Sequence, residues 1–367
     1  MSAWCLLATL VVMTVPAAGQ SLDIAAESSA ARDVAVRVRS RVESLGYAPG
    51  VGTRFVEMVR PWPCGRWKAR LDDARTAGLG AARIAQAENA VFEELARRID
   101  VAIEQTRGRS EYYHLDSVLA DRKSQCLGNC QLLFVLGGAV GLDVRAVEVK
   151  VPSVGTLAEH ESHVASLLRL ADGRVRMIDT RFAMRSRPFV LLDAYRQAGA
   201  AWDVADASDP LGVHRRIRPL DAEGIEAAVL MNIGNTYRQA GRHADADAIY
   251  RRGLELDPDS PYLHLAVAQG AMGRGDVDAA ATLIGRAITI DPGCDDAFAV
   301  LGRLLVQVNR PDDAIVALDR AIALKPRSAD ALELRGRLHE QAGHRDLAVA
   351  DFRRAAELRS RAATAGQ

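Results

Sequence analysis

The sequence predicts an α+β domain followed by an all-α solenoid, and two observations lead to this prediction. Residues 227–362 repeat with a period of 34 positions, and residues 124–215 combine one long apolar helical stretch with three short strand-like stretches. A fixed period of this length is typical of stacked helical pairs. The chain of 367 residues, with 49% hydrophobic residues, is long enough for two or three domains with substantial cores.

The charge balance limits the classes of partner. Lys and Arg together number 47, as do Asp and Glu, so the formal net charge is zero. Such a chain has no overall field toward nucleic acid or an anionic membrane. The sequence also lacks a phosphate-binding loop and a basic stripe with interleaved aromatic residues. We therefore expect protein or peptide partners, no nucleic acid, no bound metal and no cofactor.

The N-terminus has the pattern of a secretory signal peptide over residues 1–19. An apolar run from Cys5 to Val15 is followed by small residues that suit cleavage after Gly19. Export to the periplasm or out of the cell is the expectation. The first four residues carry no Lys or Arg, so an uncleaved anchor or a different start site is the alternative. Export would leave an even number of cysteines, which permits disulfides that a chain of this size does not need.

The repeats share small residues and a proline at fixed positions. The aligned positions are Gly234, Ala268, Gly302 and Gly336; Ala246, Ala280, Ala314 and Ala348; Gly253, Ala287, Ala321 and Ala355; and Pro258, Pro292 and Pro326. This pattern resembles the tetratricopeptide repeat, in which small residues let two antiparallel helices approach and an aromatic residue such as Tyr250 or Phe352 fills the gap. Four units are predicted over residues 227–362, and residues 216–226 are expected to be a linker.

The position after the first small residue of each repeat is expected to face the inner groove of the solenoid. These positions hold Asn235, Gln269, Arg303 and Arg337. The set is polar at one end and cationic at the other, so we expect it to bind an extended protein segment with an acidic group near Arg303 and Arg337. A solvated face without a ligand is the alternative.

The N-terminal part divides into a helical extension over residues 20–84 and a domain over residues 85–215. Helical periodicity covers residues 28–45 and 80–107, whereas Arg60–Gly65 contains two prolines and a glycine and is expected to be a loop. Ser124 is a candidate N-cap for a helix that runs to about Val140 and is apolar all round, hence central. Residues 144–151, 163–170 and 174–178 are expected to be strands.

Three residues in this domain have the order and spacing of a thiol catalytic triad. Cys126 begins the central helix, His163 begins a strand and Asp179 ends the next. With the Gly141 and Arg145 that follow the helix, the pattern resembles the transglutaminase-like branch of the papain-type thiol enzymes over about residues 85–215. The resemblance implies acyl transfer from an amide through a thioester, ending in hydrolysis or transfer to an amine.

The chemistry requires these residue types. A thiol attacks as the thiolate, and a helix N-terminus favours an anion. His163 would accept the thiol proton and return it to the leaving group, and Asp179 would orient the imidazole. The backbone N–H of Cys126 would help to form an oxyanion hole, with Gln125 as a candidate second donor.

The hairpin between the two strands offers a geometric check. A two-residue turn at Asp172–Gly173 would place Asp179 on the opposite face from His163. A three-residue loop with Gly173 in the left-handed conformation would make the two residues neighbours on one face. The hydrophobic pattern alone does not choose between these registers. We predict the three-residue loop, with Gly173 at positive φ, because the triad requires it.

Two other interpretations compete with the triad. Cys126, Cys130, His160 and His163 are a possible set of four zinc ligands. Alternatively, the domain is an inactive binding platform, because Ala165, Thr180 and the Ser124–Gln125 pair depart from the family pattern around the acyl site. Cys130, one turn after Cys126, is interpreted as a core residue, with a resolving thiol as the alternative.

Overall fold

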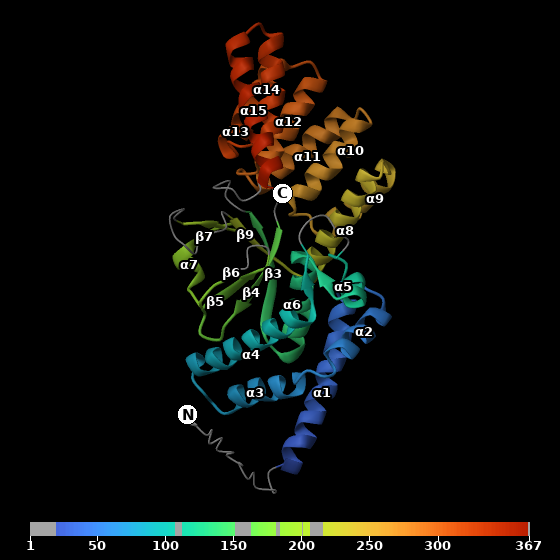
Figure 1. Cartoon of the computed structure of the whole chain (residues 1–367), viewed down its shortest axis with the longest axis vertical. Coiled ribbons are helices and arrows are strands. Elements are labelled where there is room, and N and C mark those ends of the chain that lie inside the picture. The colour runs from blue at the N-terminus through green and yellow to red at the C-terminus, as the bar shows by residue number, and fades with distance from the viewer. Residues whose placement is uncertain are drawn as a thin grey trace, which may run out of the picture.

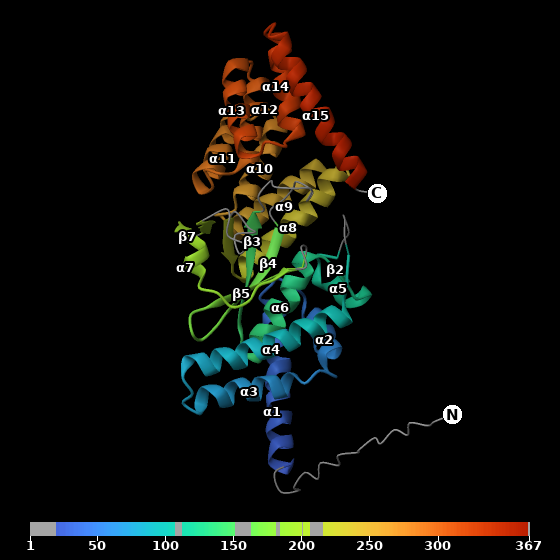
Figure 2. The same ribbon diagram turned by 60° about the vertical axis from the view of Figure 1, so that its left-hand side comes forward.

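The computed structural model describes residues 20–106, 112–150, 163–180, 184–199, 201–205 and 216–365. Four N-terminal helices lie at one end of the long axis, a sheet lies in the middle and the repeats lie at the other end (Figures 1 and 2). The predicted signal peptide, residues 1–19, lies outside the described residues. Within the described residues, no helix has the length and apolarity needed to cross a membrane.

The N-terminal helices form one side of the main core rather than a separate extension. They are α1 (Gln20–Glu43), α2 (Pro49–Val59), α3 (Cys64–Thr76) and α4 (Ala81–Ala102). Val38, Phe55 and Leu71 are fully buried and belong to the same hydrophobic cluster as the central helix α6. The apolar stripe expected on α4 is confirmed, because Val91, Leu95 and other members of that stripe face this cluster. The sequence boundary at residue 84 is therefore not a boundary between cores.

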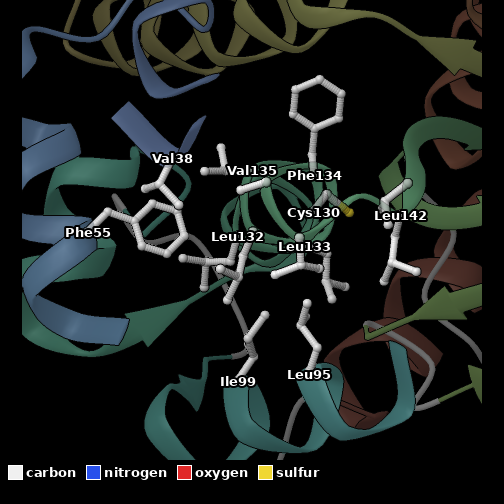
Figure 3. Close-up of a cluster of buried hydrophobic side chains, with 14 of the residues drawn as sticks. Val38, Phe55, Leu95, Ile99, Cys130, Leu132, Leu133, Phe134, Val135 and Leu142 are labelled. Carbon is white, nitrogen blue, oxygen red and sulfur yellow. The ribbon is translucent and has the colours of Figure 1, made fainter. Parts of the chain in front are cut away.

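Helix α6 (Cys126–Val140) is the centre of this core. Every residue from Leu127 to Gly137 is buried, as expected for a helix that is apolar all round. Figure 3 looks along α6 and shows Val38 and Phe55 on one side, Leu95 and Ile99 of α4 on another, and Leu142 on a third. Short elements precede α6: β1 (Glu104–Gln105), α5 (Leu115–Asp121) and β2 (Lys123–Ser124).

The sheet has the strand order β6-β5-β4-β3-β9-β8-β7, and its neighbouring strands are antiparallel. The strands are β3 (Asp143–Lys150), β4 (His163–Arg169), β5 (Val175–Asp179), β6 (Met184–Arg185), β7 (Tyr195–Ala198), β8 (Ala201–Val204) and β9 (Arg216–Leu220). The three strands predicted from sequence are β3, β4 and β5. One face packs on α6, and the other forms a smaller cluster around Tyr195, which follows α7 (Leu191–Ala194).

The segment expected to be a linker is part of the folded core. Strand β9 lies between β3 and β8, and α8 (Ala222–Gln239) begins two residues after it. Ile217 is fully buried within the sheet, and Ile225 and Val229 of α8 are buried against the α6 core. The linker prediction for residues 216–226 missed this because Arg216, Arg218 and Pro219 mask the strand pattern.

The described residues after β9 form the expected four helical pairs. They are α8 with α9 (His243–Leu256), α10 (Pro261–Gly273) with α11 (Val277–Ile290), α12 (Asp295–Gln307) with α13 (Pro311–Leu324), and α14 (Ala329–Gln341) with α15 (Arg345–Ala365). A Cβ atom added to Gly234 would lie 2.4 Å from the ring of Tyr250, and one added to Gly336 would lie 2.8 Å from Phe352. The predicted role of the small residues and aromatic partners is therefore confirmed.

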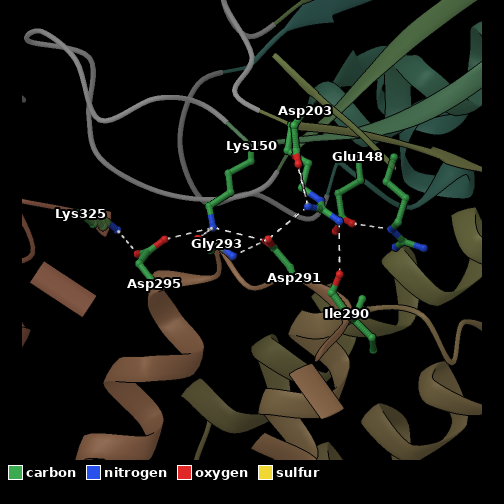
Figure 4. A network of polar contacts seen from close by, with 10 residues as sticks. Glu148, Lys150, Asp203, Ile290, Asp291, Gly293, Asp295 and Lys325 are labelled. Carbon is green, nitrogen blue, oxygen red and sulfur yellow. Dashed lines mark hydrogen bonds and ion pairs between the residues drawn. The ribbon is translucent and has the colours of Figure 1, made fainter. Parts of the chain in front are cut away.

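A buried polar network joins the sheet to the turns between repeats (Figure 4). Lys150, the last residue of β3, donates to the Gly293 carbonyl at 2.7 Å and lies 3.2 Å from Asp295. Arg218 of β9 makes a bidentate pair with Asp257 at 2.9 and 2.7 Å and also binds Glu148 of β3. Burial acts to lower the pKa of Arg218, but the two carboxylates raise it overall. The repeats are thus fixed to the sheet.

We predict that the first repeat and the α6 core unfold together. Ile225→Asp places a carboxylate in the shared core, and we expect a loss of about 3 kcal/mol or more in the free energy of unfolding. The measurement is urea denaturation followed by circular dichroism and tryptophan fluorescence. Val316→Asp is the control, because Val316 is 68% exposed on α13. The prediction would be contradicted if the variant showed two separate unfolding transitions and the transition of the N-terminal core were the same as in the wild type.

Candidate functional site

The β4–β5 hairpin has the three-residue loop that the triad geometry requires. Leu170 donates its N–H to the Arg174 carbonyl at 2.9 Å, which leaves Ala171–Gly173 as the loop. Ser166 pairs with Ile178, so the register continues to Ala165 opposite Asp179. Gly173 has φ +83°, a conformation that suits glycine. The prediction of this loop is confirmed, and the two-residue turn is wrong.

His163 and Asp179 meet on one face of the sheet. The distance from His163 Nε2 to Asp179 Oδ2 is 2.6 Å, and the exposed fractions of the two side chains are 2% and 0%. His163 lies opposite Val149 of β3, so its backbone is held against that strand. Since Nε2 faces the carboxylate, proton exchange between this imidazole and a thiol must use Nδ1.

Cys126 is the first residue of α6, and its side chain is partly exposed. The predicted N-cap, Ser124, is wrong: Ser124 belongs to β2, and its hydroxyl donates to the Gln125 carbonyl at 2.9 Å. Gln125 occupies the N-cap position in an extended conformation without a side-chain cap hydrogen bond. The first N–H groups of α6 therefore begin at Cys126 itself, where the helix dipole favours an anion.

The contacts of Cys130 place the nucleophile end of α6 over the start of β4. Cys130 Sγ lies 3.3 Å from the carbonyl oxygen of Val164, the residue after His163. Cys126 and Cys130 are four residues apart on one helix and so share a face, with Cβ atoms about 5–6 Å apart. Cys126 thus lies one helical turn from a thiol that contacts the neighbour of His163.

Cys130 is not suited to act as the nucleophile. Its side chain is buried, and burial raises the pKa of the Cys130 thiol well above its ordinary value, with Cys126 and Asp179 adding to the effect. A neutral, buried thiol fits the core-packing interpretation. The described cysteines, Cys64, Cys126, Cys130 and Cys294, form no disulfide with one another.

The zinc alternative involves a residue that the structure does not describe. His160 lies outside the described residues. Within the described part of the chain, no group of three or more His, Cys, Asp or Glu residues has an arrangement that could hold a metal ion. The zinc set from the sequence is therefore reduced to Cys126, Cys130 and His163 among the described residues, and these do not form a metal site.

Buried polar contacts that the sequence did not predict support the start of α6. Tyr47 donates its hydroxyl to Gln131 Oε1 at 2.7 Å and accepts the N–H of Leu115 at 3.0 Å. Gln131 Nε2 donates to the Tyr113 carbonyl at 2.7 Å. The polar residue Gln131 within a mostly apolar helix was the signal that could have indicated this network.

The backbone hydrogen bond of Gln125 limits how this residue could contribute to an oxyanion hole. Its N–H donates to the Tyr112 carbonyl at 3.0 Å, so an oxyanion contact from Gln125 would have to come from its side-chain amide. Gln125 as a second oxyanion donor stays a prediction. Gly128, in the same turn of α6, permits the close approach of this backbone, since an added Cβ would lie 2.7 Å from the Tyr112 oxygen and 2.5 Å from Ser124 Oγ.

The residues predicted to line the repeat groove have different surroundings. Asn235 accepts a hydrogen bond from the Tyr250 hydroxyl at 2.8 Å, and Gln269 is half-buried. Arg303 has an exposed side chain, yet burial lowers its pKa, and the charge of Arg238 from the first repeat adds to this effect.

Arg337, the other cationic residue of that set, forms an ion pair with Glu333 one turn earlier in α14. Glu333 also pairs with Arg359 of α15. Arg337 therefore has an acidic neighbour on its own helix, and the acidic contact expected near Arg303 and Arg337 stays a prediction.

We predict that Gly128→Ala displaces the start of α6. The added methyl group meets backbone and a short buried side chain, so we expect a loss of about 1–3 kcal/mol in the free energy of unfolding and a changed rate of Cys126 alkylation. Urea denaturation and iodoacetamide labelling measure the two effects. Gly285→Ala is the matched control, because a Cβ there meets nothing within 4 Å in α11. Equal stability of the two variants would argue against close packing at Gly128.

We predict that the protein loses stability in base through its buried thiols. Burial raises the pKa values of Cys64 and Cys294 to about 12. Above pH about 8.5 the unfolded thiols lose protons that the folded thiols keep, so the free energy of unfolding should fall by about 1.4 kcal/mol per pH unit for each group. Below pH about 8.5 the contribution of both thiols to the free energy of unfolding is fully present. Urea denaturation between pH 7 and 10 should show a shallower decline for Cys294→Ala than for the wild type; equal slopes would contradict this.

Comparison with known families identifies the repeats. Models of the tetratricopeptide repeat match residues 227–294, 271–338 and 329–361. No match to the chain was found among curated proteins. The family matches fall on the helical pairs from α8 to α15 and support the predicted repeats.

Three solved structures illustrate the similarity. A crystal structure of MamA is 28% identical, with a TM-score of 0.33, and the match covers 38% of this chain and 81% of that one. The first tetratricopeptide domain of Spaghetti, solved with an HSP90 peptide, is 20% identical, with a TM-score of 0.30. This match covers 32% of the present chain and 93% of that one. YrrB, described as having an unusual peptide-binding site, is 23% identical, with a TM-score of 0.30. This match covers 36% of the present chain and 68% of that one. The family models show that residues 227–361 of the chain are tetratricopeptide repeats.

Proposed function

We propose that this chain is an exported thiol-dependent acyl-transfer protein of the transglutaminase-like type, acting on an amide or peptide bond, whose repeats bind a protein partner. The observation that carries the proposal is the buried His163–Asp179 pair, with 2.6 Å between the imidazole and the carboxylate. His163 and Asp179 lie on the neighbouring strands β4 and β5, on the face of Ala165 and Met177, and α6, which Cys126 begins, packs on the other face of these strands. Such a constellation suits nucleophilic catalysis by a thiol.

The first half of the reaction forms a thioester. His163 Nδ1 takes the proton of the Cys126 thiol, and the thiolate attacks the carbonyl carbon of the amide. The carbonyl electrons move to oxygen, where the Cys126 N–H and the Gln125 side chain would donate hydrogen bonds. The oxyanion then collapses, the carbon–nitrogen bond breaks, and the imidazolium gives its proton to the departing amine.

The second half releases the acyl group. Water or an amine attacks the thioester carbon, and the same imidazole removes the proton of the attacking group. Collapse of the second intermediate breaks the carbon–sulfur bond and returns the proton to the thiolate of Cys126. Attack by water gives a carboxylic acid, and attack by an amine gives a new amide. Asp179 stays ionised throughout and stabilises the imidazolium.

The second candidate function is a binding protein without catalysis. The family models favour it, because their matches are confined to residues 227–361. Ala165, Thr180 and the Ser124–Gln125 pair also depart from the pattern that surrounds the acyl site in transglutaminase-like enzymes. In this alternative the α+β domain is a binding platform, and the repeats recruit a partner through the groove positions Asn235, Gln269, Arg303 and Arg337.

We predict that Cys126 reacts as an activated thiol. In the native protein, alkylation of Cys126 by iodoacetamide should reach half its maximal rate at least one pH unit below the value of about 8.5 for a free thiol. Asp179→Asn should move this midpoint upward and reduce labelling by an electrophilic amide about 10²-fold or more. Quantitative mass spectrometry of the labelled cysteine gives both results.

Two controls separate the candidate functions. Cys126→Ser should abolish labelling by the electrophilic amide, and Cys130→Ser should leave it unchanged. The thiol mechanism is contradicted if the pH of half-maximal alkylation of Cys126 is at or above that of a free thiol and Asp179→Asn does not change it. The binding protein is then the better explanation. Labelling at Cys130 in place of Cys126 would overturn the assignment of the nucleophile.

A further inference from the structure

A cavity lies at the end of α6 that is opposite to Cys126. Its volume is about 440 Å³, and α1, the second half of α6, the start of β3 and the start of α8 contribute its lining. Gly138, which lines it, follows Cys126 by 12 positions, so the cavity is about 18 Å along the helix axis from the candidate nucleophile. A cavity of this volume is large enough for a small organic molecule.

The guanidinium of Arg41, from α1, lies against α6 in this cavity. Its Cζ is 4.3 Å from the centroid of the Phe134 ring, and its Nε donates to the Phe134 carbonyl at 3.2 Å. Gly138 permits this contact, because a Cβ atom there would lie 2.2 Å from Arg41 Cζ. A guanidinium that is already ordered in this way binds an anion with less loss of side-chain entropy.

Arg41 and Arg145, which both line the cavity, keep hydrogen-bond donors for a further partner. Arg41 uses Nε for its bond to Phe134, and no carboxylate of the described residues lies within ion-pair distance of its guanidinium. Arg145 also uses Nε, which donates to Asp143 at 2.8 Å. A guanidinium has five N–H donors, so those on the terminal nitrogens Nη1 and Nη2 of both residues remain.

The two acidic residues of the lining, Asp143 and Asp221, are already engaged. Asp143 forms its ion pair with Arg145, and the Asp221 carboxylate caps α8 by accepting the Gly224 N–H at 2.8 Å. Burial lowers the pKa of Arg41, and the charge of Arg145 adds to this effect, whereas Asp143 opposes it. The two guanidinium groups thus repel each other, and a monoanion bound between them would relieve this repulsion.

The rest of the cavity wall is apolar. Phe134, Leu142 and Val144 line it and are buried members of the main core. Figure 3 shows Phe134 on the side of α6 opposite to Leu95 and Ile99, so this ring is not needed to cover α4. An apolar wall next to guanidinium groups suits a molecule with one anionic end and a hydrocarbon body.

We propose that this cavity binds a small organic carboxylate. The carboxylate accepts hydrogen bonds from the terminal nitrogens of Arg41 and Arg145, and the hydrocarbon body packs on Phe134 and Val144. A carboxylate is favoured over a phosphate dianion, because the two aspartates of the lining repel a second negative charge more strongly. The site is separate from the thiol and from the groove of the repeats, and the proposal does not depend on the acyl-transfer reaction.

The test titrates the full chain with sodium benzoate and sodium hexanoate in isothermal titration calorimetry at constant ionic strength. Arg41→Gln should weaken the binding of either carboxylate about tenfold or more. Arg32→Gln is the matched control and should bind as the wild type does, because Arg32 is an exposed arginine of the same helix that does not line the cavity. Benzamide, a neutral molecule of nearly the same shape, should bind at least about tenfold more weakly than benzoate.

Arg145→Gln keeps the proposal testable if Arg41→Gln does not fold. The Arg145 side chain is 45% exposed, so its replacement should leave the core intact, as circular dichroism would show. This variant should also bind benzoate more weakly than the wild type.

Four outcomes would overturn the proposal. The first is that the wild type binds neither benzoate nor hexanoate at millimolar concentration. The second is that the folded arginine variants bind benzoate as tightly as the wild type does. The third is equal binding of benzamide and benzoate, which would make the contact apolar alone. The fourth is tighter binding of inorganic phosphate or of the tripeptide Gly-Gly-Leu, which would assign the cavity to a phosphate group or to the C-terminus of a peptide.

Discussion

The burial of helix α6 is the constraint on which the rest of the structure depends. A helix that is apolar on every side must be covered on every side, and α1 to α4, the sheet and α8 supply that cover. Each Leu, Val or Phe buried in this way contributes about 1.5–3 kcal/mol relative to exposure. Cys126 at the first position of α6 is partly exposed, whereas Leu127 to Gly137 are buried. The candidate nucleophile therefore sits at the end of the most firmly held element of the N-terminal part.

The same constraint explains why the repeats are joined rigidly to the sheet. Helix α8 begins the first repeat and also covers α6, so the solenoid starts inside the core of the preceding domain. Further along, Lys150 and Arg218 are each surrounded by carboxylates, and breaking one partner of such buried pairs costs about 3–5 kcal/mol. Lys150 ends the strand whose Val149 pairs with His163. The turns of the repeats thereby hold the strand next to the candidate site.

The sequence located the repeats and the hairpin register, whereas it missed the N-cap of α6 and the strand within the expected linker. Period and small residues located the repeats, since only a few side chains fit between close helices. The hairpin register was predictable once Gly173 was assigned a left-handed conformation. The N-cap was wrong because Ser124 is paired in β2, and the linker was wrong because β9 has only a short alternating pattern. The contact of Tyr47 with Gln131 joins residues 84 positions apart and could not be found from local pattern.

The buried His163–Asp179 pair is the feature that best separates the two candidate functions. Removing a carboxylate and an imidazole from water is expensive, and apolar residues of similar size at such positions are often neutral or stabilising. The neighbouring residues on that face, such as Ala165, Leu167 and Met177, are apolar, so the fold itself has no need of the pair. A thiol enzyme requires an oriented imidazole beside its nucleophile. The pair is therefore the observation on which the proposed acyl-transfer function rests.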